Sequence, residues 1–369
     1  MVNTHNLFGL LYRNIFRPLA FCMDAEMVHN VMLSIGENLE IAVPALERLF
    51  VYKNTMLKRS VLGIPFANPV GLAAGFDADG HCAGIMKHVG FGFNTVGTVT
   101  AKPSQGNPKP RYGRLPKSLS LFVNKGFRSD GADEVAKRLE TKDLRGHMIG
   151  ISVGSTNSQS VSTISKAIDD YLYTFHVFKD KPYVSYFELN ISCPNIIMTE
   201  SFEEKRHYQN LIREVAALRI RQPILVKMPN EIHCENIDIL VRSGLAKEIQ
   251  GYIFSNLVTD RSNDAFNSQE VQRFAGINGN FSGRPAKHNA LHSVRHVRKT
   301  FGHNIAIVGA GGICTVSDAI EYFQAGADLI QLITGMIYQG PQITGELCKG
   351  ITEYFSKTSS CERNKTLLQ

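Results

Sequence analysis

The feature that most constrains this chain is a regular alternation of short apolar segments with helical patterns, which begins near residue 61. Eight segments have the length and apolar character of buried strands: VGLAAG (70–75), FNTVGTVT (93–100), MIGISVG (148–154), YFELNIS (186–192), PILVKM (223–228), GYIFSN (251–256), IAIVGAGG (305–312) and LIQLIT (329–334). Segments with helical periodicity lie between them, at 159–177, 202–220, 235–247, 288–301 and 315–325. Strands that alternate with helices form βαβ units with a parallel sheet, and eight such units close into a barrel. The sequence therefore predicts an α/β fold of the (β/α)8, or TIM barrel, type.

The length of the chain fits one such barrel with additions at its ends. Its 369 residues, of which 43% are apolar, are enough for one large core. We expect the barrel domain to span 46–355. The stretch 101–130 is rich in proline, glycine and basic residues, which favours a loop over the barrel mouth. The last residues, 356–369, have the composition of a flexible tail.

The first 45 residues have a different pattern. The segment LFGLLYRNIFRPLAF (7–21) is strongly apolar with two arginines, and we expect Pro18 to break it near its end. A second amphipathic segment (24–40) begins with Asp24 as a helix N-cap. Two such helices suit a patch lying in a membrane interface, or they pack on the domain behind them as ordinary helices. The pattern alone slightly favours packing.

Charge and cysteine content indicate which partners and which cell compartment suit the protein. The formal net charge of +7 fits an anionic partner, but the basic residues are spread along the chain, as on a solvated basic surface. Seven cysteines without a C-x-x-C pair indicate reduced thiols in a cytosolic-type compartment. No apolar run reaches the roughly 18 residues of a membrane span. We therefore expect no membrane-spanning segment.

Active sites of β/α barrels lie at the carboxyl ends of the strands, so the residues that end each predicted strand are candidates. They are small residues, amides, hydroxyls, one thiol and one lysine: Ala73, Ala74, Gly75, Thr98, Thr100, Ser152, Asn190, Ser192, Cys193, Asn195, Lys227, Ser255, Asn256, Gly311, Gly312, Thr334 and Gly335. Small residues let the backbone approach a flat ligand, and amides offer donors and acceptors to a heterocycle. The twelve histidines cluster neither with each other nor with carboxylates at ligand spacing, so no metal site is predicted.

Glycines after the last two strands indicate a phosphate-binding site. GAGGI (309–313) and TGM (334–336) fall where barrels hold a phosphate by backbone N–H groups. The loop FSGRP (281–285) adds another glycine and a basic neighbour. A glycine run can also serve only to turn the chain, but the coincidence of the three segments favours an anionic phosphate group.

Lys227 and Cys193 are the two candidates with chemical reactivity. Lys227 ends an apolar strand, where it either pairs structurally or stabilises the electron-rich form of a cofactor ring. Cys193 lies in NISCPN (190–195), between Asn190 and Asn195. A buried free cysteine is usually inert, whereas a thiol among polar partners can act as a proton acceptor or nucleophile.

With these residues identified, the chain resembles the class 2, quinone-dependent dihydroorotate dehydrogenases, which are FMN-containing β/α barrels preceded by a small helical domain. The resemblance covers nearly the whole chain and rests on LYRNIFRPLAFCMDAEMVH, GLAAGFDADG, VGTVTAKPSQGNPKPRYGRL, NISCPN, VKM, TDRS, SGRP, GAGGI and TGMIYQGP. It implies oxidation of dihydroorotate to orotate in pyrimidine biosynthesis, with electrons passed to quinone. It also implies a peripheral protein at the cytoplasmic face of the cell membrane, a monomer or homodimer that binds no nucleic acid.

The resemblance assigns roles to individual residues. A base, here Cys193, removes a proton from C5 of the substrate while hydride leaves C6 for the flavin. Residues implied to bind FMN are Ala73, Ala74, Gly75, Thr98, Ser152, Asn190, Lys227, Ser255, Asn256, Ser282, Gly283, Gly311, Gly312, Thr334 and Gly335. Residues implied to bind the pyrimidine are Asn124, Asn190, Asn195 and Asn256. His29 and Arg114 match positions of a quinone site between the N-terminal helices.

Several positions depart from the class 2 pattern. Cys193 stands where class 2 has a serine, and Ala78 replaces a lysine that contacts flavin and the substrate carboxylate. Four more polar contacts are lost, at Val123, Ser152, Leu257 and Ile333. Lys125 or Arg128 would have to supply the missing cation. A related substrate without a carboxylate, such as a dihydropyrimidine or an enone, and a non-catalytic FMN-binding scaffold are the alternatives.

Overall fold

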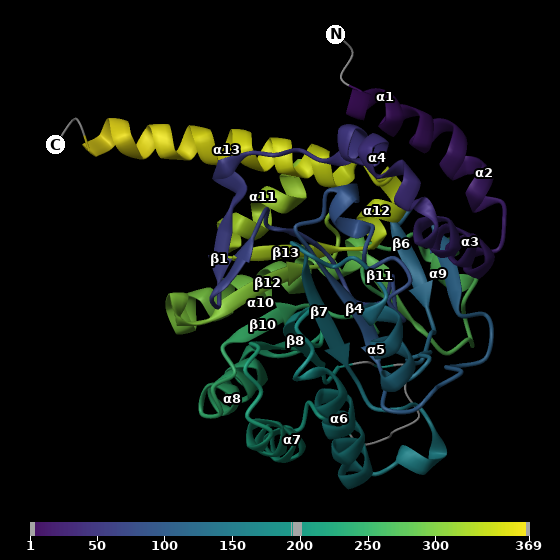
Figure 1. The fold of residues 1–369 in the computed structure, drawn as a ribbon, viewed down its shortest axis with the longest axis vertical. Helices are drawn as coiled ribbons and strands as arrows, with labels where there is room; N and C mark the ends of the chain where they lie inside the picture. The colour runs from purple at the N-terminus through teal and green to yellow at the C-terminus, as the bar shows by residue number, and fades with distance from the viewer. Residues whose placement is uncertain (1–3, 193, 195–200, 367–369) are drawn as a thin grey trace.

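The computed structural model describes residues 4–192, 194 and 201–366, and its centre is a closed barrel (Figure 1). Eight parallel strands neighbour one another in chain order: β3 (Val70–Leu72), β4 (Phe93–Val99), β7 (Met148–Val153), β8 (Val184–Asn190), β9 (Ile224–Met228), β10 (Gly251–Phe254), β12 (Ala306–Ala310) and β13 (Leu329–Leu332). Each overlaps one of the eight predicted segments, so the predicted barrel is confirmed. Most of these strands are buried along their whole length, which is why they appear in the sequence as apolar runs without alternation.

Helices cover the outside of the barrel. They are α5 (Ala132–Glu140), α6 (Ile164–Phe178), α7 (Lys205–Ala217), α8 (Cys234–Leu245), α10 (Lys287–Phe301) and α11 (Val316–Ala325), and they confirm the five predicted helical segments. Local signals define their ends. In α11, Thr315 and Asp318 form a reciprocal capping box, and Gly326 ends the helix with a φ of 106°.

A short hairpin closes the amino-terminal end of the barrel. It consists of β1 (Arg59–Val61) and β2 (Ile64–Phe66), which pair antiparallel. Phe66 packs on Phe93 of β4 with their ring centroids 5.0 Å apart. Because this end is plugged by side chains, the opposite end, here called the mouth, is the one that can accept a ligand.

The predicted loop 101–130 contains a second hairpin, so that prediction was incomplete. Strands β5 (Tyr112–Leu115) and β6 (Ser120–Val123) pair with each other, and β11 (Asn280–Gly283) completes a three-stranded sheet. A small core under this sheet includes Phe122. The Phe122 ring stacks on that of Phe274, just after α9 (Ser268–Gln272), with the ring centroids 4.3 Å apart. The third strand comes from far along the chain, so local sequence carries little sign of it.

The N-terminal segment is helical and lies over the mouth side of the barrel (Figure 1). Its elements are α1 (Thr4–Leu11), the π-helical turn η1 (Tyr12–Phe16), α2 (Arg17–Phe21), α3 (Ala25–Glu37) and α4 (Val43–Phe50). The expected N-cap is confirmed, because an Asp24 carboxylate oxygen accepts the Met27 N–H at 2.8 Å. The predicted domain boundary at residue 45 falls inside α4.

The predicted break at Pro18 is wrong. The helix continues through it to Phe21, and the wide turn η1 comes immediately before it. In that turn the Arg17 N–H bonds to the Tyr12 carbonyl five residues earlier. This shift of the hydrogen-bond ladder accommodates a residue that has no N–H and whose ring crowds the preceding turn.

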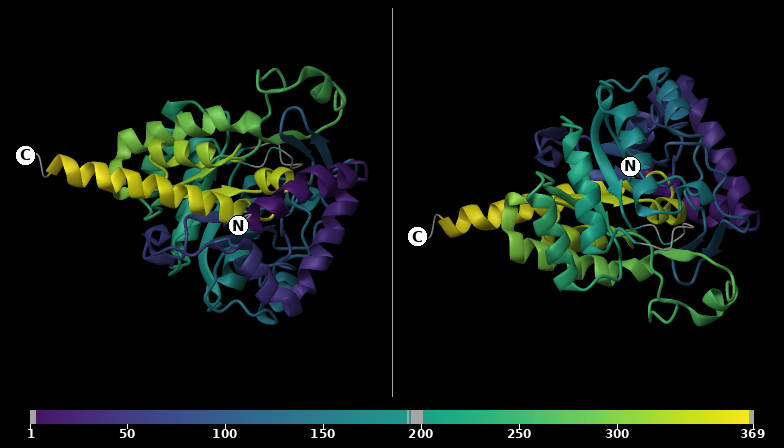
Figure 2. Two further views of the ribbon diagram at one scale, coloured as in Figure 1. Left: turned by 90° about the horizontal axis from the view of Figure 1, so that it is seen from above. Right: turned by 90° about the horizontal axis from the view of Figure 1, so that it is seen from below.

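The C-terminal part comprises α12 (Thr334–Gln339) and the long α13 (Ile343–Thr366). The predicted tail, 356–369, is therefore helical as far as Thr366. Helix α13 projects well beyond the barrel in all views (Figure 2). Within the described ranges, none of the helices combines the length and hydropathy that crossing a membrane requires.

Candidate active site

Four polar side chains at or just beyond the carboxyl ends of β4, β8, β9 and β10 meet at the mouth. Asn190 ends β8 in register with Lys227 of β9. The Asn190 amide donates to the Thr98 hydroxyl at 2.9 Å, and the Asn256 amide donates to Asn190 Oδ1 at 3.2 Å. Asn190, Thr98 and Lys227 are buried. The amides are thus held in defined orientations before any ligand binds.

Further hydrogen bonds fix the ends of these strands. The Ser192 hydroxyl donates to the Lys227 carbonyl at 2.8 Å, and Asn256 donates to the Ser192 hydroxyl at 3.0 Å. Ser152 is fully buried, with its hydroxyl 2.9 Å from that of Thr98. Cys193 and Asn195 lie outside the described residues, but Ser192, next to the cysteine, is anchored at the mouth.

A cradle of glycines and hydroxyls lies at the ends of β11, β12 and β13. The hydroxyls of Ser282 and Thr334 are 2.8 Å apart. Gly311 and Gly312 have φ angles of 114° and 67°, a left-handed conformation that favours glycine. A Cβ on Gly335 would lie 2.0 Å from the Ile313 carbonyl oxygen. The backbone here approaches so closely because side chains are absent, as a bound phosphate requires.

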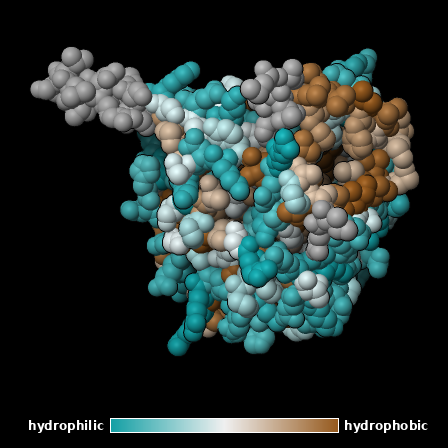
Figure 3. All heavy atoms as spheres, turned by 45° about the horizontal axis from the view of Figure 1, so that its top comes forward, coloured by the Kyte–Doolittle hydropathy of each residue, from teal (hydrophilic) through white to brown (hydrophobic). Residues whose placement is uncertain are grey.

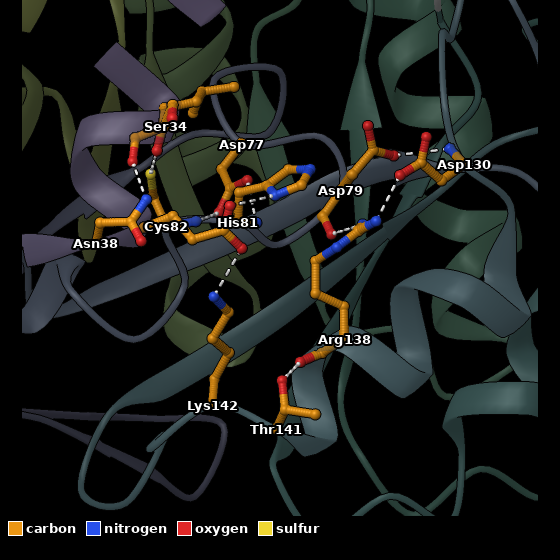
Figure 4. A network of polar contacts seen from close by, with 12 residues as sticks. Ser34, Asn38, Asp77, Asp79, His81, Cys82, Asp130, Arg138, Thr141 and Lys142 are labelled. Carbon is orange, nitrogen blue, oxygen red and sulfur yellow. Dashed lines mark hydrogen bonds and ion pairs between the residues drawn. The ribbon is translucent and has the colours of Figure 1, made fainter. Parts of the chain in front are cut away.

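The loop after β3 forms another wall of the mouth. The Gly75 N–H donates to the Gly97 carbonyl at 2.7 Å, and the Gly97 N–H donates to the Asp77 carbonyl at 3.1 Å. The buried Asp77 carboxylate accepts the N–H groups of His81 and Cys82, both at 2.8 Å. Burial raises the pKa of Asp77. This buried carboxylate stabilises the turn that follows Gly75 (Figure 4).

The same loop holds helix α3. Cys82 Sγ contacts the Leu33 carbonyl at 3.3 Å, and His81 Nδ1 lies 3.1 Å from a Glu37 carboxylate oxygen. Lys142 reaches the other oxygen of Glu37 at 2.9 Å (Figure 4). The N-terminal helices are thus attached to the segment that lines the mouth.

Asp79, His81 and Asp130 place potential metal ligands within 4.8 Å of one another, which the sequence spacing did not predict. These groups already have partners. The Arg138 guanidinium pairs with Asp130 at 2.7 Å, and His81 contacts Glu37. Exposed acidic groups of this kind are common without a metal, so we assign no metal to them.

A cavity of about 510 Å³ connects the mouth with the N-terminal helices. Its inner end is lined by mouth residues, including Thr98, Asn190 and Lys227. Its outer end is lined by Phe8, Tyr12 and other residues of α1–α4. One continuous space therefore reaches from the polar mouth to the apolar helices.

The two predicted quinone-site residues both line this cavity. Arg114 donates to the Met23 carbonyl at 2.7 Å and lies over the Phe21 ring, 4.7 Å from its centroid. Burial, together with the nearby Lys125 and Arg128 charges, lowers the pKa of His29 to about 3. His29 is therefore neutral near pH 7.

Apolar side chains gather on the outer surface of these helices, around a hollow visible in Figure 3. Fourteen large hydrophobic side chains are exposed in the described part of the chain, and eleven belong to residues 7–35. These eleven, here called the apolar patch, are Leu7, Leu10, Leu11, Ile15, Phe16, Leu19, Met23, Met27, Val31, Met32 and Ile35. A concentration of this kind marks an interaction surface rather than scattered exposure.

The structure brings most of the predicted site residues together. Those that line the cavity are Ala74, Gly75, Thr98, Asn190, Lys227, Asn256, Ser282 and Thr334, with His29 and Arg114. Predicted residues found beside it, in the supporting walls, are Ala73, Ser152, Ser255, Gly283, Gly311, Gly312 and Gly335.

Asn124 is placed differently from the prediction. Its side chain accepts a hydrogen bond from Asn107 at 2.7 Å, while its neighbours Val123 and Lys125 line the cavity. Side chains alternate in direction along an extended segment, so a one-residue offset places the lysine where we expected the asparagine.

Sequence reasoning missed Asn230, which follows β9. Its amide donates to the Ser255 hydroxyl at 2.6 Å and to the Ala286 carbonyl at 2.9 Å. It thereby ties the mouth to the loop that precedes α10. The sequence did offer one signal for Asn230, because it lies two residues after the end of a predicted strand, where site residues are expected.

Comparisons with known proteins agree with this architecture. The family model described as dihydroorotate dehydrogenase matches residues 56–355. Among solved structures, DHODH from Eimeria tenella in complex with ferulenol superposes with a TM-score of 0.80 at 25% identity, covering 91% of this chain and 92% of that one. The ligand-free form from the same organism also gives 0.80, at 26% identity, with 91% and 96% covered.

Curated relatives extend the likeness to the N-terminal helices. The dihydroorotate dehydrogenase (quinone) of Synechococcus sp. (strain JA-3-3Ab) is 33% identical, over 97% of this chain and 97% of its own. The protein of the same name from Idiomarina loihiensis is 34% identical, over 89% of this chain and 96% of its own. This chain therefore belongs to the dihydroorotate dehydrogenase family, in its quinone-dependent class.

Proposed function

We propose that this protein oxidises dihydroorotate to orotate and delivers the electrons to a quinone at a membrane surface. The observation that carries the proposal is the continuous cavity, which joins a polar mouth to the apolar outer helices. A reaction with one polar and one apolar substrate needs both environments within reach of one redox centre. The names of the curated relatives support the same pair of substrates.

Flavin mononucleotide is the cofactor that fits the mouth. The glycine cradle with Ser282 and Thr334 suits its phosphate, and the small residues Ala74 and Gly75 leave room for a flat ring. Lys227, buried at the end of β9, places a positive charge where an electron-rich ring is stabilised. When bound, this cofactor accepts hydride from one substrate and supplies electrons to the other.

Cys193 is the proposed base for the proton on C5 of dihydroorotate. Its neighbour Ser192 is held by the Lys227 carbonyl, so the chain enters residue 193 from a fixed point at the mouth. Asn190, at the end of β8, and Asn256, just after β10, present amides to the pyrimidine ring from either side of β9. In this proposal Asn190 and Asn256 orient the pyrimidine ring, and Cys193 removes the proton.

The outer end of the cavity is the proposed entry for quinone. The apolar patch surrounds it, and basic residues such as Arg13 and Arg17 lie on the same helices. Helices with an exposed apolar face and basic residues lie in the interface of a bilayer. We therefore assign a peripheral location at the cytoplasmic membrane face, with His29 and Arg114 contacting the quinone head group.

Anaerobic mixing tests this function. The oxidised protein, reconstituted with flavin mononucleotide, is mixed separately with dihydroorotate, dihydrouracil and dihydrothymine, and the visible flavin band is followed. Dihydroorotate alone should bleach the band, and a short-chain quinone should restore it. Bleaching by a neutral dihydropyrimidine, or by none of the three, would contradict the proposal.

A further inference from the structure

The proposed substrate carries a carboxylate, and part of the cavity wall near the mouth is apolar. Ala78, Val123 and Leu257 all line the cavity. A carboxylate that leaves water for such a wall needs a cation and hydrogen-bond donors, because an unpaired buried charge is strongly unfavourable. The proposed function already assigns Lys227, buried at the end of β9, to the cofactor ring. A second cation is therefore required.

Lys125 enters the cavity from the loop after β6. Both of its neighbours face Asn107: Asn124 accepts a hydrogen bond from it, and a Cβ on Gly126 would lie 2.5 Å from its side chain. Lys125, between them, lines the cavity together with Gly126, whereas Asn124 does not. The direction of Lys125 thus follows from the packing of the residues on either side.

The Lys125 ammonium lies at the mouth wall. Its Nζ is 3.4 Å from the carbonyl oxygen of Gly75, a contact long enough to be given up to a stronger acceptor. The Gly75 peptide is itself held by Gly97. Lys125 also lines a second, small cavity of about 30 Å³, of which Ala78 again forms part. Lys125 and Ala78 thus line both cavities.

The effect of Lys125 on its surroundings supports this position. Burial, followed by the Lys125 and Arg128 charges, lowers the pKa of His29, and the His29 ring lies 5.3 Å from that of Phe76, the residue after Gly75. Within the described ranges no carboxylate forms an ion pair with Lys125. The ammonium is thus a half-buried charge available to an anionic ligand.

We infer that Lys125 pairs with the carboxylate of the substrate and makes the site prefer an anionic dihydropyrimidine to a neutral one. This inference rests on the proposed function. Lys125 is a specificity-determining residue in this assignment, because it contacts a part of the substrate that does not react. Arg128 lines the same cavity but is exposed, so it is the matched control.

The test measures binding of orotate and of uracil, its carboxylate-free counterpart, to the flavin-loaded protein by calorimetry. Lys125→Met keeps the length of the side chain and removes the charge. It should weaken orotate binding about 30-fold or more and leave uracil binding within about threefold, as expected when one partner of a desolvated charge pair is lost. Lys125→Arg should restore most of the orotate affinity. Arg128→Met should change it less than about threefold.

The two half-reactions separate this inference from the proposed function. If the parent protein neither binds orotate nor is bleached by dihydroorotate, the function itself fails, and the inference with it. If the parent passes both tests but Lys125→Met binds orotate as the parent does, the inference alone is overturned. It is equally overturned if Arg128→Met shows the larger loss, or if Lys125→Met slows only reoxidation by quinone. Should Lys125→Met lose its flavin, Lys125→Gln repeats the comparison.

Discussion

The amide of Asn256 donates to Asn190 Oδ1 at 3.2 Å and so joins the carboxyl ends of β10 and β8 across the intervening strand β9. Asn190 in turn donates to Thr98 on β4. A line of side-chain hydrogen bonds thus crosses the mouth. Its members are more than isolated ligand contacts, because each one orients the next.

Asn256→Ala removes the donor to Asn190 and leaves its buried oxygen without that partner. An unsatisfied buried group costs about 1 to 3 kcal/mol, which corresponds to a roughly 5- to 150-fold slower reduction of the flavin by dihydroorotate. Stopped-flow absorbance measures this rate. Asn38→Ala is the control, because Asn38 caps the end of α3, away from the strand ends, and donates to the Ser34 carbonyl. Equal reduction rates in Asn256→Ala and Asn38→Ala would show that the hydrogen bonds across the mouth do not position the substrate.

Cys193→Ala should keep the flavin and lose at least about 100-fold in the rate of flavin reduction, the contribution expected of a general base. The ratio of flavin to protein and the rate of bleaching are the two measurements. Cys22→Ala removes an exposed cysteine and should behave as the parent. A parental rate in Cys193→Ala would transfer the role of base to another group.

Gly312→Ala should lose flavin mononucleotide. Its φ of 67° makes any side chain strained, and the new Cβ would lie 2.7 Å from that of Lys287. Gly276→Ala has a similar φ of 73° with open space around the Cβ. Both variants should lose about 1 to 2 kcal/mol of stability from backbone strain. Only Gly312→Ala should weaken flavin retention, measured by fluorescence of the released cofactor. Equal retention in the two would show that the phosphate binds elsewhere.

Leu19→Glu should weaken binding to phospholipid vesicles. Leu19 is 65% exposed within the apolar patch, and burial of a leucine in the interface contributes about 1.5 to 3 kcal/mol, or roughly 10-fold or more in affinity. Ile239→Glu on α8 makes the same type of change at a residue that is 38% exposed outside the patch. Cosedimentation compares the two. Reduction of the flavin by dihydroorotate should stay at the parental rate in both. Unaltered cosedimentation of Leu19→Glu would argue against the patch as the docking face.

His147 should make stability depend on pH. Burial, with Lys87 and His88 nearby, lowers its pKa to about 3, and its ring lies 2.5 Å from the Asn94 side-chain oxygen. Between pH 6.5 and about 3 the unfolded chain binds a proton that the folded chain does not. The contribution of His147 to the free energy of unfolding is therefore complete above pH 6.5. Below that pH it falls by up to about 1.4 kcal/mol per pH unit.

His147→Gln keeps a donor for Asn94 and removes this proton linkage. Its free energy of unfolding, from urea titrations at several pH values, should vary less steeply than that of the parent below pH 6.5. His303→Gln, at an exposed position, should follow the parent profile. Parallel profiles for His147→Gln and the parent would contradict the assignment.

The sequence predicted the barrel because strands buried on both faces appear as short continuous apolar runs, whereas the amphipathic helices between them show a helical period. The hairpin β5–β6 escaped prediction because its strands are short and its third partner, β11, is remote in the chain. The break at Pro18 was misjudged because proline penalties refer to a regular α-helix, whereas η1 precedes this proline.

At the mouth, the sequence predicted the location of residues at strand ends, but not the direction of side chains that a loop sets. Asn190 and Lys227 follow directly from strand register. Asn124 was misplaced because Asn107, from another part of the loop, draws it away from the cavity. No local pattern reports such a contact. The roles of Cys193 and Asn195 stay predictions.

The short loop from Ala73 to Cys82 lines the mouth at one end and anchors α3 at the other. A small molecule lodged between the N-terminal helices would therefore contact a helix that is attached to the wall of the mouth. Inhibitor screens could therefore record the absorbance of the flavin as well as turnover, because one loop borders both the helices and the mouth. Resistance substitutions are accordingly to be sought in this loop as well as among residues that the inhibitor touches.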